Sequence, residues 1–176
     1  LAGSIPSSIS DNIYKDIMTS LKDKNVLIIV DATKNLLMNV LEYKPFLIKP
    51  NNYELCEIFN VPVTYDKNEI IKYAKILKEK GARNVLVSLA GEGAVLVSEN
   101  NDVFICDAPK GNVINSVGAG DSMVAGFIAG WIETKNYEQA FKMGVSAGTA
   151  SALSENFCTK QEVIKILNQL NLKKSF

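Results

Sequence analysis

The chain has 176 residues, which is enough for one domain with a hydrophobic core. Lysine and arginine together number 19, and so do aspartate and glutamate, so no net basic field is present to bind nucleic acid or an anionic membrane. Histidine is absent, which excludes every catalytic triad, metal site and general base that depends on an imidazole.

The cysteines and the hydropathy pattern indicate the compartment. Cys56, Cys106 and Cys158 are widely spaced and form no CxxC pair, so we expect free thiols in a reducing compartment. No apolar run reaches the roughly 18 residues that a membrane helix needs, and no signal-peptide pattern is present. We therefore expect a cytoplasmic protein. Without an initiator Met, residues 1–6 look like a strand end entering a loop, so we expect a fragment of a longer polypeptide.

The first third of the chain predicts two helices and two strands. Apolar residues recur every four positions near its start: Ile9, Ile13, Ile17 and Leu21. This spacing predicts an amphipathic helix, entered from a Pro-Ser-Ser loop at residues 6–8. Residues 25–31 form a continuous apolar run that ends in an acid, which is typical of a strand buried on both faces of a parallel sheet. Residues 46–49 predict a shorter strand, followed by a helix that ends near Phe59.

The middle of the chain predicts a helix, a strand and a hairpin. Asp66 and Glu69 fit a capping box at a helix start, and Gly81 is the expected C-cap. The apolar stripe of this helix contains Ile70, Ala74 and Leu77. Residues 84–89 predict a buried strand, and residues 94–106 predict a hairpin that turns near residues 99–101.

The last third predicts three helices. Four apolar residues of the first recur at helical spacing: Val124, Phe127, Ile128 and Trp131. The second is rich in small residues that favour close packing: Ala140, Gly144, Ala147, Gly148 and Ala150. The third begins at a capping box formed by Thr159 and Glu162. Strands alternating with helices predict an α/β fold with a mainly parallel sheet.

The sequence Gly-Ala-Gly-Asp at residues 118–121 is the most informative motif. Two glycines just before a helix allow a tight turn, and the amides of the first helical turn form an anion site together with the helix dipole. Asp121 then places a carboxylate beside that site, as a phosphoryl-transfer enzyme requires of its general base. The alternative is a plain loop, with Asp121 as an acid that offsets the helix dipole. The motif is neither a Walker A loop nor a dinucleotide fingerprint, since Met123 stands where the third glycine would be.

A second motif, KPNxxE at residues 49–54, follows a predicted strand. Ligands of open α/β sheets bind at the carboxyl ends of the strands, where Lys49 could pair with a phosphate. Asn51 and Glu54 could orient waters on Mg²⁺, which keeps much of its hydration shell in proteins. The same two residues also fit a helix capping box, and both interpretations can hold together.

Three further positions lie next to predicted strands. Residues 88–93 could admit a nucleotide against bare backbone, or could form only the tight connection into the next strand. Asp31 ends a strand and could bond a sugar hydroxyl, or could have no function. Arg83, the only arginine, precedes a strand and so lies at the opposite edge, which leaves no arginine here to clamp a sugar phosphate.

Taken together and in this order, these motifs resemble those of the ribokinase-like (phosphofructokinase-B) carbohydrate kinases. The order is an SGS-type loop at the N-terminus, a strand ending in Asp31, KPNxxE, an SxGxxG-like turn and then GAGD. The match spans nearly the whole chain, and the stretch at residues 115–127 is most similar to that of bacterial 1-phosphofructokinases and tagatose-6-phosphate kinases. The resemblance implies a three-layer α/β/α sandwich. It also implies that residues 1–176 are the C-terminal, nucleotide-binding part of a kinase domain, without its N-terminal part and lid.

The resemblance also implies a role for each motif. Asp121 would be the catalytic base, and Gly118, Ala119 and Gly120 would supply the anion hole. ATP would be bound by Lys49, Ser88, Gly91, Gly93 and Asn156. Asn51 and Glu54 would organise the magnesium–phosphate network, and no residue is assigned as a direct metal ligand. Asp31 would contact the substrate.

Two positions depart from the family's pattern. Ala90, followed by Gly91, stands where many members have the first glycine of SxGxxG, which weakens the expectation of backbone contacts at that turn. Asn115 stands where many members have an aspartate, which weakens the expectation of a monovalent-cation site.

The implied reaction is phosphorylation of a ketohexose phosphate by ATP with Mg²⁺, most specifically D-fructose 1-phosphate to fructose 1,6-bisphosphate. Alternatives are a tagatose-6-phosphate kinase, a non-catalytic nucleotide-binding module, and a dehydrogenase, which the missing third glycine argues against. Partners would be the sugar phosphate and ATP, with a possible homodimer through the absent lid. We expect the chain alone to be inactive.

Overall fold

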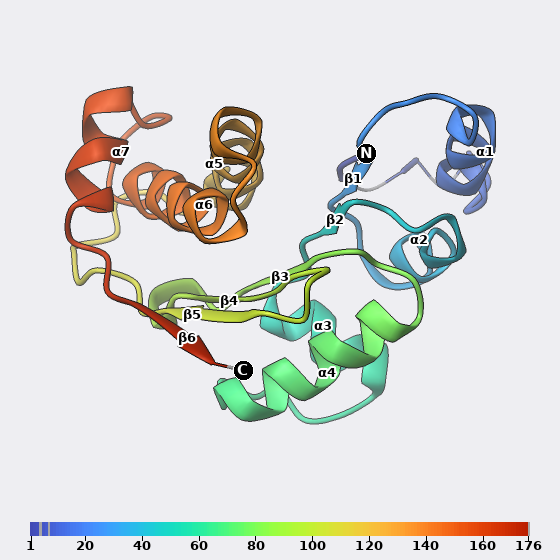
Figure 1. Cartoon of the computed structure of the whole chain (residues 1–176), viewed down its shortest axis with the longest axis horizontal. Helices are drawn as coiled ribbons and strands as arrows, with labels where there is room; N and C mark the ends of the chain where they lie inside the picture. The colour runs from blue at the N-terminus through green and yellow to red at the C-terminus, as the bar shows by residue number, and fades with distance from the viewer. Residues whose placement is uncertain (4, 7, 176) are drawn as a thin grey trace. The chain divides into compact units, whose positions relative to one another are not determined.

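The computed structural model describes residues 1–3, 5–6 and 8–175 (Figure 1). Ser4 of the predicted SGS-type loop and Ser7 of the predicted Pro-Ser-Ser loop lie outside the described residues. The chain forms two compact units, which we call the first unit (residues 1–87 and 96–102) and the second unit (residues 88–95 and 103–176). Hydrogen bonding orders the six strands β1-β2-β3-β4-β5-β6 in a mixed sheet, so the predicted α/β class is confirmed.

The parallel part of the sheet contains β1 (Ile29–Val30), β2 (Leu47–Ile48) and β3 (Val85–Ser88). β2 pairs with both neighbours, with Ile29 opposite Leu47 and Ile48 opposite Val85. The predicted strand at residues 25–31 is too long: Val26 and Leu27 are 52% and 47% exposed. The Val26 amide donates to the Lys24 carbonyl in a turn instead of joining a strand.

Among its described residues, the first unit also contains four α-helices and a 3₁₀ helix. They are α1 (Ile13–Leu21), α2 (Lys34–Met38), η1 (Leu41–Tyr43), α3 (Asn52–Phe59) and α4 (Lys67–Glu79). The sequence predicted α1, α3 and α4, but Ile9 lies before α1 and is exposed, and α2 and η1 were not predicted. Asp66 caps α4, and the predicted stripe Ile70, Ala74 and Leu77 is buried.

The C-cap of α4 is Lys80, one residue before the predicted Gly81. Gly81 has φ +137°, and a Cβ there would lie 1.9 Å from the Leu41 carbonyl oxygen. The glycine is therefore required by its backbone conformation and by the close approach of a neighbouring chain segment.

The second unit contains η2 (Ala90–Glu92), β5 (Val103–Cys106), α5 (Ala119–Thr134), α6 (Tyr137–Ala152), α7 (Lys160–Leu167) and β6 (Leu172–Ser175). β4 (Ala94–Val97) precedes β5, as the predicted hairpin requires, and the Ser98 amide donates to the Asp102 carbonyl at its turn. β6 was not predicted; it pairs antiparallel with β5, with Cys106 opposite Leu172.

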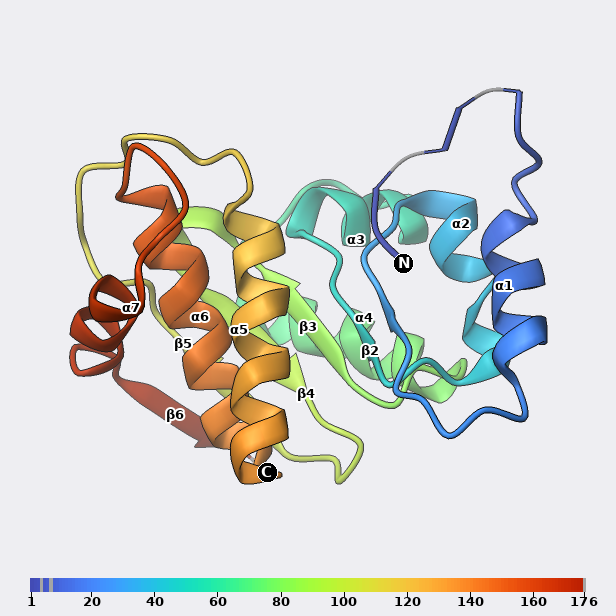
Figure 2. The ribbon, with the colours of Figure 1, turned by 90° about the horizontal axis from the view of Figure 1, so that it is seen from above.

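Helices α5 and α6 lie side by side and pack through small residues (Figure 2). A Cβ added at Gly126 would lie 2.6 Å from the Met143 carbonyl oxygen, and one at Gly144 would lie 2.9 Å from the Met123 carbonyl oxygen. Phe127 of the predicted apolar stripe is buried, whereas Val124 is only partly buried. The predicted close packing is confirmed, and glycines on both helices carry it.

Substituting Gly126 with alanine should destabilise the protein. The clash meets backbone atoms that cannot rotate away, so it should outweigh the roughly 1 kcal/mol that alanine gains in helix propensity. We expect a net loss of about 1–2 kcal/mol in the free energy of unfolding, measured in urea. Gly91→Ala is the control, because a Cβ at Gly91 meets no atom within 4 Å. Equal stability of the two variants would contradict the packing account.

Candidate active site

In the first unit, Asp31 and Lys49 form an ion pair where two parallel strands end. The Lys49 Nζ lies 3.1 Å from Asp31 Oδ2, and Lys49 is only 5% exposed. Asp31 follows β1 and Lys49 follows β2, so the parallel register brings them to the same edge. The Asp31–Lys49 pair places a buried ammonium group at the sheet edge where α/β proteins bind ligands. Asp31 also acts on Tyr14: burial is the larger cause, and the Asp31 carboxylate the second, that raises the pKa of the Tyr14 hydroxyl above its ordinary value.

Asn51 and Glu54 form the predicted capping box at the start of α3. Asn51 Oδ1 accepts the Glu54 amide at 2.8 Å, and Glu54 Oε2 accepts the Asn51 amide at 2.8 Å. The structural interpretation of these two residues is thus confirmed. The second carboxylate oxygen of Glu54 has no hydrogen bond within the described residues. Such an oxygen fits the water shell of Mg²⁺, which prefers hard oxygen ligands.

In the second unit, Gly118 directs the chain into α5. It has φ +76°, a left-handed conformation that favours glycine. The Ala119 amide donates to the Ser116 carbonyl at 3.2 Å. The amides of Gly118, Gly120 and Asp121 donate no hydrogen bond within residues 8–175. Free first-turn amides fit an anionic group, although the Ala119 amide, which we expected among them, already has an acceptor.

Asp121 lies in the first turn of α5 and is exposed. Its carboxylate makes no hydrogen bond or ion pair with any residue that the structure describes. It is therefore available to accept a proton and lies on the same helical turn as the free amides. This arrangement can stabilise a phosphoryl group and deprotonate a hydroxyl that attacks it.

At residues 88–93, where we predicted a nucleotide-binding turn, the backbone geometry alone accounts for the glycine at position 93. Gly93 has φ +96°, and a Cβ there would lie 1.9 Å from the Cys106 carbonyl oxygen. The Leu89 amide donates to the Gly93 carbonyl at 2.8 Å, which closes the turn. Ala90 has φ +49°, so the alanine that departs from the family's pattern occupies a conformation suited to glycine. Ser88 ends β3, and Gly91 lies in open space.

Asn156 lies in the loop between α6 and α7 and is exposed. Its neighbour Phe157 is also exposed, yet its ring covers Gly118: a Cβ at Gly118 would lie 2.6 Å from Phe157 Cε1. Sequence analysis missed this contact and the Asp31–Lys49 pair. Since both residues of the pair end neighbouring parallel strands, their spacing was a usable signal for the pair, whereas nothing in the sequence indicates the contact of Phe157.

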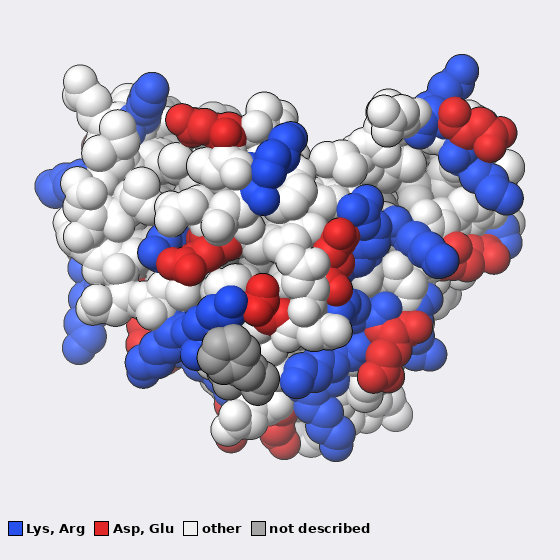
Figure 3. Space-filling view, viewed as in Figure 1, with Lys and Arg blue, Asp and Glu red and all other residues white. Residues whose placement is uncertain are grey.

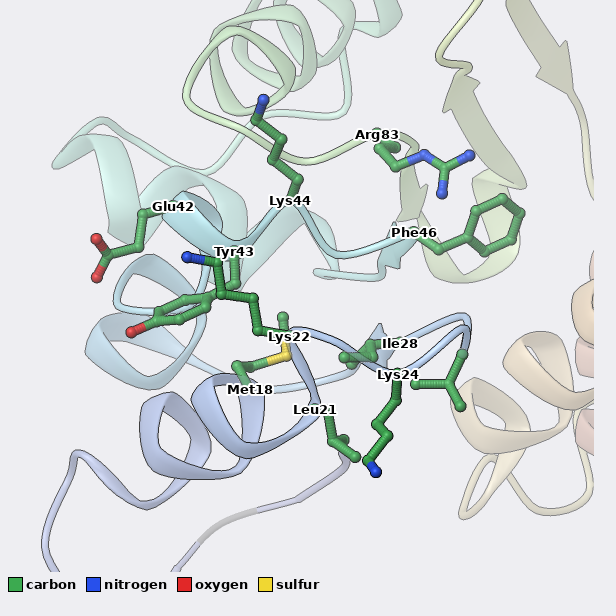
Figure 4. A pocket seen from close by; sticks show the side chains of 11 residues that line it. Met18, Leu21, Lys22, Lys24, Ile28, Glu42, Tyr43, Lys44, Phe46 and Arg83 are labelled. Atoms are coloured by element: carbon green, nitrogen blue, oxygen red, sulfur yellow. The ribbon is translucent and has the colours of Figure 1, made fainter.

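A pocket of about 520 Å³ lies elsewhere in the first unit (Figure 4). It is lined by residues of α1, η1 and the segments that precede the parallel strands, including Ile28, Phe46 and Arg83. Its basic side chains do not converge: Lys24 and Lys44 extend in different directions (Figure 4). None of the predicted site residues lines this pocket. Arg83 is bound to Glu99, with 2.6 Å between Nε and Oε2.

The described residues contain no group of three or more Cys, Asp or Glu side chains placed to hold a metal ion. Acidic and basic side chains are interspersed on the face that Figure 3 shows. Within the part of the chain that the structure covers, no helix has the length and apolar character that crossing a membrane requires. Each unit thus offers its own groups for a phosphate: the first unit has the buried ammonium group of Lys49, and the second unit has the backbone amides at the start of α5.

Solved structures of sugar kinases share this fold. Phosphofructokinase-2 from Escherichia coli, solved with substrates and products, matches 95% of this chain and 55% of its own with a TM-score of 0.86 and 28% identity. A ribokinase from Arabidopsis thaliana with ribose and ATP matches 92% of this chain and 54% of its own with a TM-score of 0.74; at 21% identity it supports the fold alone.

The sequence comparisons identify the family. Residues 1–163 match the pfkB family of carbohydrate kinases, and the chain belongs to that family. It is 43% identical over 172 residues to a 1-phosphofructokinase from Bacillus subtilis, and 28% identical over 172 residues to a D-tagatose-1-phosphate kinase from Bacillus licheniformis. Each match covers 98% of this chain and 56% of the relative, so the chain spans little more than half the length of these relatives.

Proposed function

We propose that this chain is the nucleotide-binding part of an ATP-dependent ketohexose-phosphate kinase that converts D-fructose 1-phosphate to fructose 1,6-bisphosphate. The exposed Asp121 carboxylate, on the same helical turn as free amides, is the observation that supports this most directly. The 43% identity to a 1-phosphofructokinase favours fructose 1-phosphate over a tagatose phosphate as the substrate.

In the proposed reaction, Asp121 accepts the proton of the sugar 6-hydroxyl as its oxygen attacks the γ-phosphorus of ATP. The amides of Gly118 and Gly120 stabilise the charge on the transferred group, and ADP leaves. Lys49 contacts the ATP phosphates from its position beside Asp31. Asn51 and Glu54 would orient the waters of a magnesium ion bound with ATP, and that ion would neutralise phosphate charge.

The remaining proposed roles concern binding. Ser88, Gly91, Gly93 and Asn156 line the nucleotide site. For Asp31 we now favour holding Lys49 in place over contact with a sugar hydroxyl, because the ion pair accounts for it. Arg83 is bound to Glu99 and stacks on Phe46, so the clamp for the sugar's existing phosphate comes from sequence outside this chain. A homodimer formed through a lid outside this chain, and a cytoplasmic location, belong to the same proposal.

A coupled assay of ADP release by the full-length protein tests the substrate. We expect turnover with fructose 1-phosphate to exceed turnover with tagatose 6-phosphate, tagatose 1-phosphate and fructose 6-phosphate. A preference for a tagatose phosphate would contradict fructose 1-phosphate as the substrate, but it would still support a ketohexose-phosphate kinase. An absence of turnover with every ketohexose phosphate would overturn the class.

The chain alone should bind ATP weakly and should not phosphorylate sugar. A lid that excludes water and completes the site belongs to the part of such kinases that this chain lacks, so its own contacts to ATP are incomplete. Isothermal titration of ATP–Mg²⁺ into the chain should show no micromolar binding, and the coupled assay should show no turnover. Tight binding, or turnover by the chain alone, would contradict this expectation.

A further inference from the structure

A pair of serines links the first turn of α5 to the end of α6. The Ser151 hydroxyl donates to Ser122 Oγ at 2.8 Å, across 29 residues of sequence. Ser151 is 3% exposed, and Ser122, directly after Asp121, is partly buried. The Cys158 amide donates to the same Ser151 oxygen at 3.3 Å. Ser151 therefore connects three segments: α5, α6 and the loop that carries Asn156.

Ser151 differs from Ser146, the other buried serine of α6. Ser146 donates to the Lys142 carbonyl, four residues earlier, at 2.8 Å. That bond satisfies a serine locally and makes no link to another helix. Ser151 donates to a different helix instead, so it contributes to tertiary structure beyond the satisfaction of one buried hydroxyl.

A second contact joins the same loop to the same helix end. The Phe157 ring covers Gly118, where a Cβ would lie only 2.6 Å from Phe157 Cε1. The far side of the loop is anchored at the start of α7, where Glu162 accepts hydrogen bonds from Thr159 and from Ser154. The hydrogen bonds from Thr159 hold the pKa of Glu162 below its ordinary value.

We propose that Ser151 is a positioning residue that, through Ser122, fixes the first turn of α5 and with it Asp121 and the free amides. This inference rests on the proposed function of Asp121 as the base. Because Ser151 also holds the Cys158 amide, it couples the order of the catalytic turn to the order of the loop around Asn156. Binding of a nucleotide that orders the loop then also orders the turn that carries the base.

Amide hydrogen exchange in the full-length protein, without ligand, tests the link independently of activity. Ser151→Ala should speed exchange of the Ser122 and Cys158 amides by about 3–10-fold, which corresponds to the loss of one ordinary hydrogen bond. Ser122→Ala should speed exchange of the amide at residue 122 and leave the Cys158 amide protected, because the Ser151 hydroxyl still accepts its hydrogen bond. Ser146→Ala, which removes a buried hydroxyl of α6 without a link to α5, should change neither amide.

Steady-state kinetics then test positioning. Ser151→Ala and Ser122→Ala should each lower kcat by about 3–10-fold, and the double variant should be no worse than Ser151→Ala, because both remove one link. Ser146→Ala should keep kcat within two-fold of the parent. Unchanged exchange in Ser151→Ala, or faster exchange with unchanged kcat, would overturn the proposal. If the parent itself phosphorylates no sugar, the proposed function fails, and the exchange data alone decide whether the link orders the turn.

Discussion

Replacing Asp121 with asparagine in the full-length protein should lower kcat by a factor of about 10²–10⁴, the usual contribution of a general base. Asparagine keeps the size of the side chain and cannot take the proton of the attacking hydroxyl. The KM for ATP should change little, because the free amides of the same turn and Lys49 remain. Initial rates from the coupled assay measure both constants.

Glu133→Gln is the matched control for this substitution. Glu133 is an exposed carboxylate near the other end of α5, so its neutralisation makes the same change of charge on the same helix. We expect its kcat to stay within two-fold of the parent. If Asp121→Asn also kept kcat within a few-fold, Asp121 would be an acid that only offsets the helix dipole, and the assignment of the base would be wrong.

Replacing Lys49 with methionine should lower kcat/KM for ATP by about 10–100-fold, the value of a hydrogen bond between charged groups. Methionine keeps the unbranched shape of the side chain up to Cε and removes the ammonium group that lies beside Asp31. The variant should also lose stability, because the Asp31 carboxylate loses a buried cation 3.1 Å away.

The double variant Asp31→Asn with Lys49→Met separates the two effects. Neutralising both residues removes the electrostatic penalty, so the free energy of unfolding should recover toward that of the parent. The defect in kcat/KM should persist, because the contact with the ATP phosphates is still missing. Recovery of activity together with stability would show that Lys49 serves only as the partner of Asp31.

Local signals in the sequence predicted much of this fold. The capping boxes at Asn51 and Thr159 form in the structure, because each is a contact between residues three positions apart. The small residues of α6 predicted close packing, which Gly144 and its neighbours on α5 confirm. The run at residues 25–31 gave a strand that was too long, since an apolar pattern indicates burial but does not supply the pairing partner that β structure requires. The polar strand β6 carries too few apolar residues to produce any signal.

In the candidate site too, local sequence signals identified single residues but not the contacts between distant ones. Position after a strand or before a helix was enough to select Lys49 and Asp121. The positions of Asp31 and Lys49 at strand ends indicated the same sheet edge, although the ion pair itself was not predicted. The link between Ser122 and Ser151 had no signal in the sequence, because it depends on the packing of two helices. The roles of these residues in catalysis remain predictions, and the substitutions above test them one at a time.

A crystal structure of the full-length protein with a non-hydrolysable ATP analogue, Mg²⁺ and fructose 1-phosphate tests the central claim most directly. It should show the γ-phosphate at the amides of Gly118 and Gly120, with an Asp121 carboxylate oxygen about 2.6–3.2 Å from the sugar 6-hydroxyl. An analogue bound elsewhere, or an Asp121 carboxylate out of reach of any sugar hydroxyl in the closed complex, would contradict it.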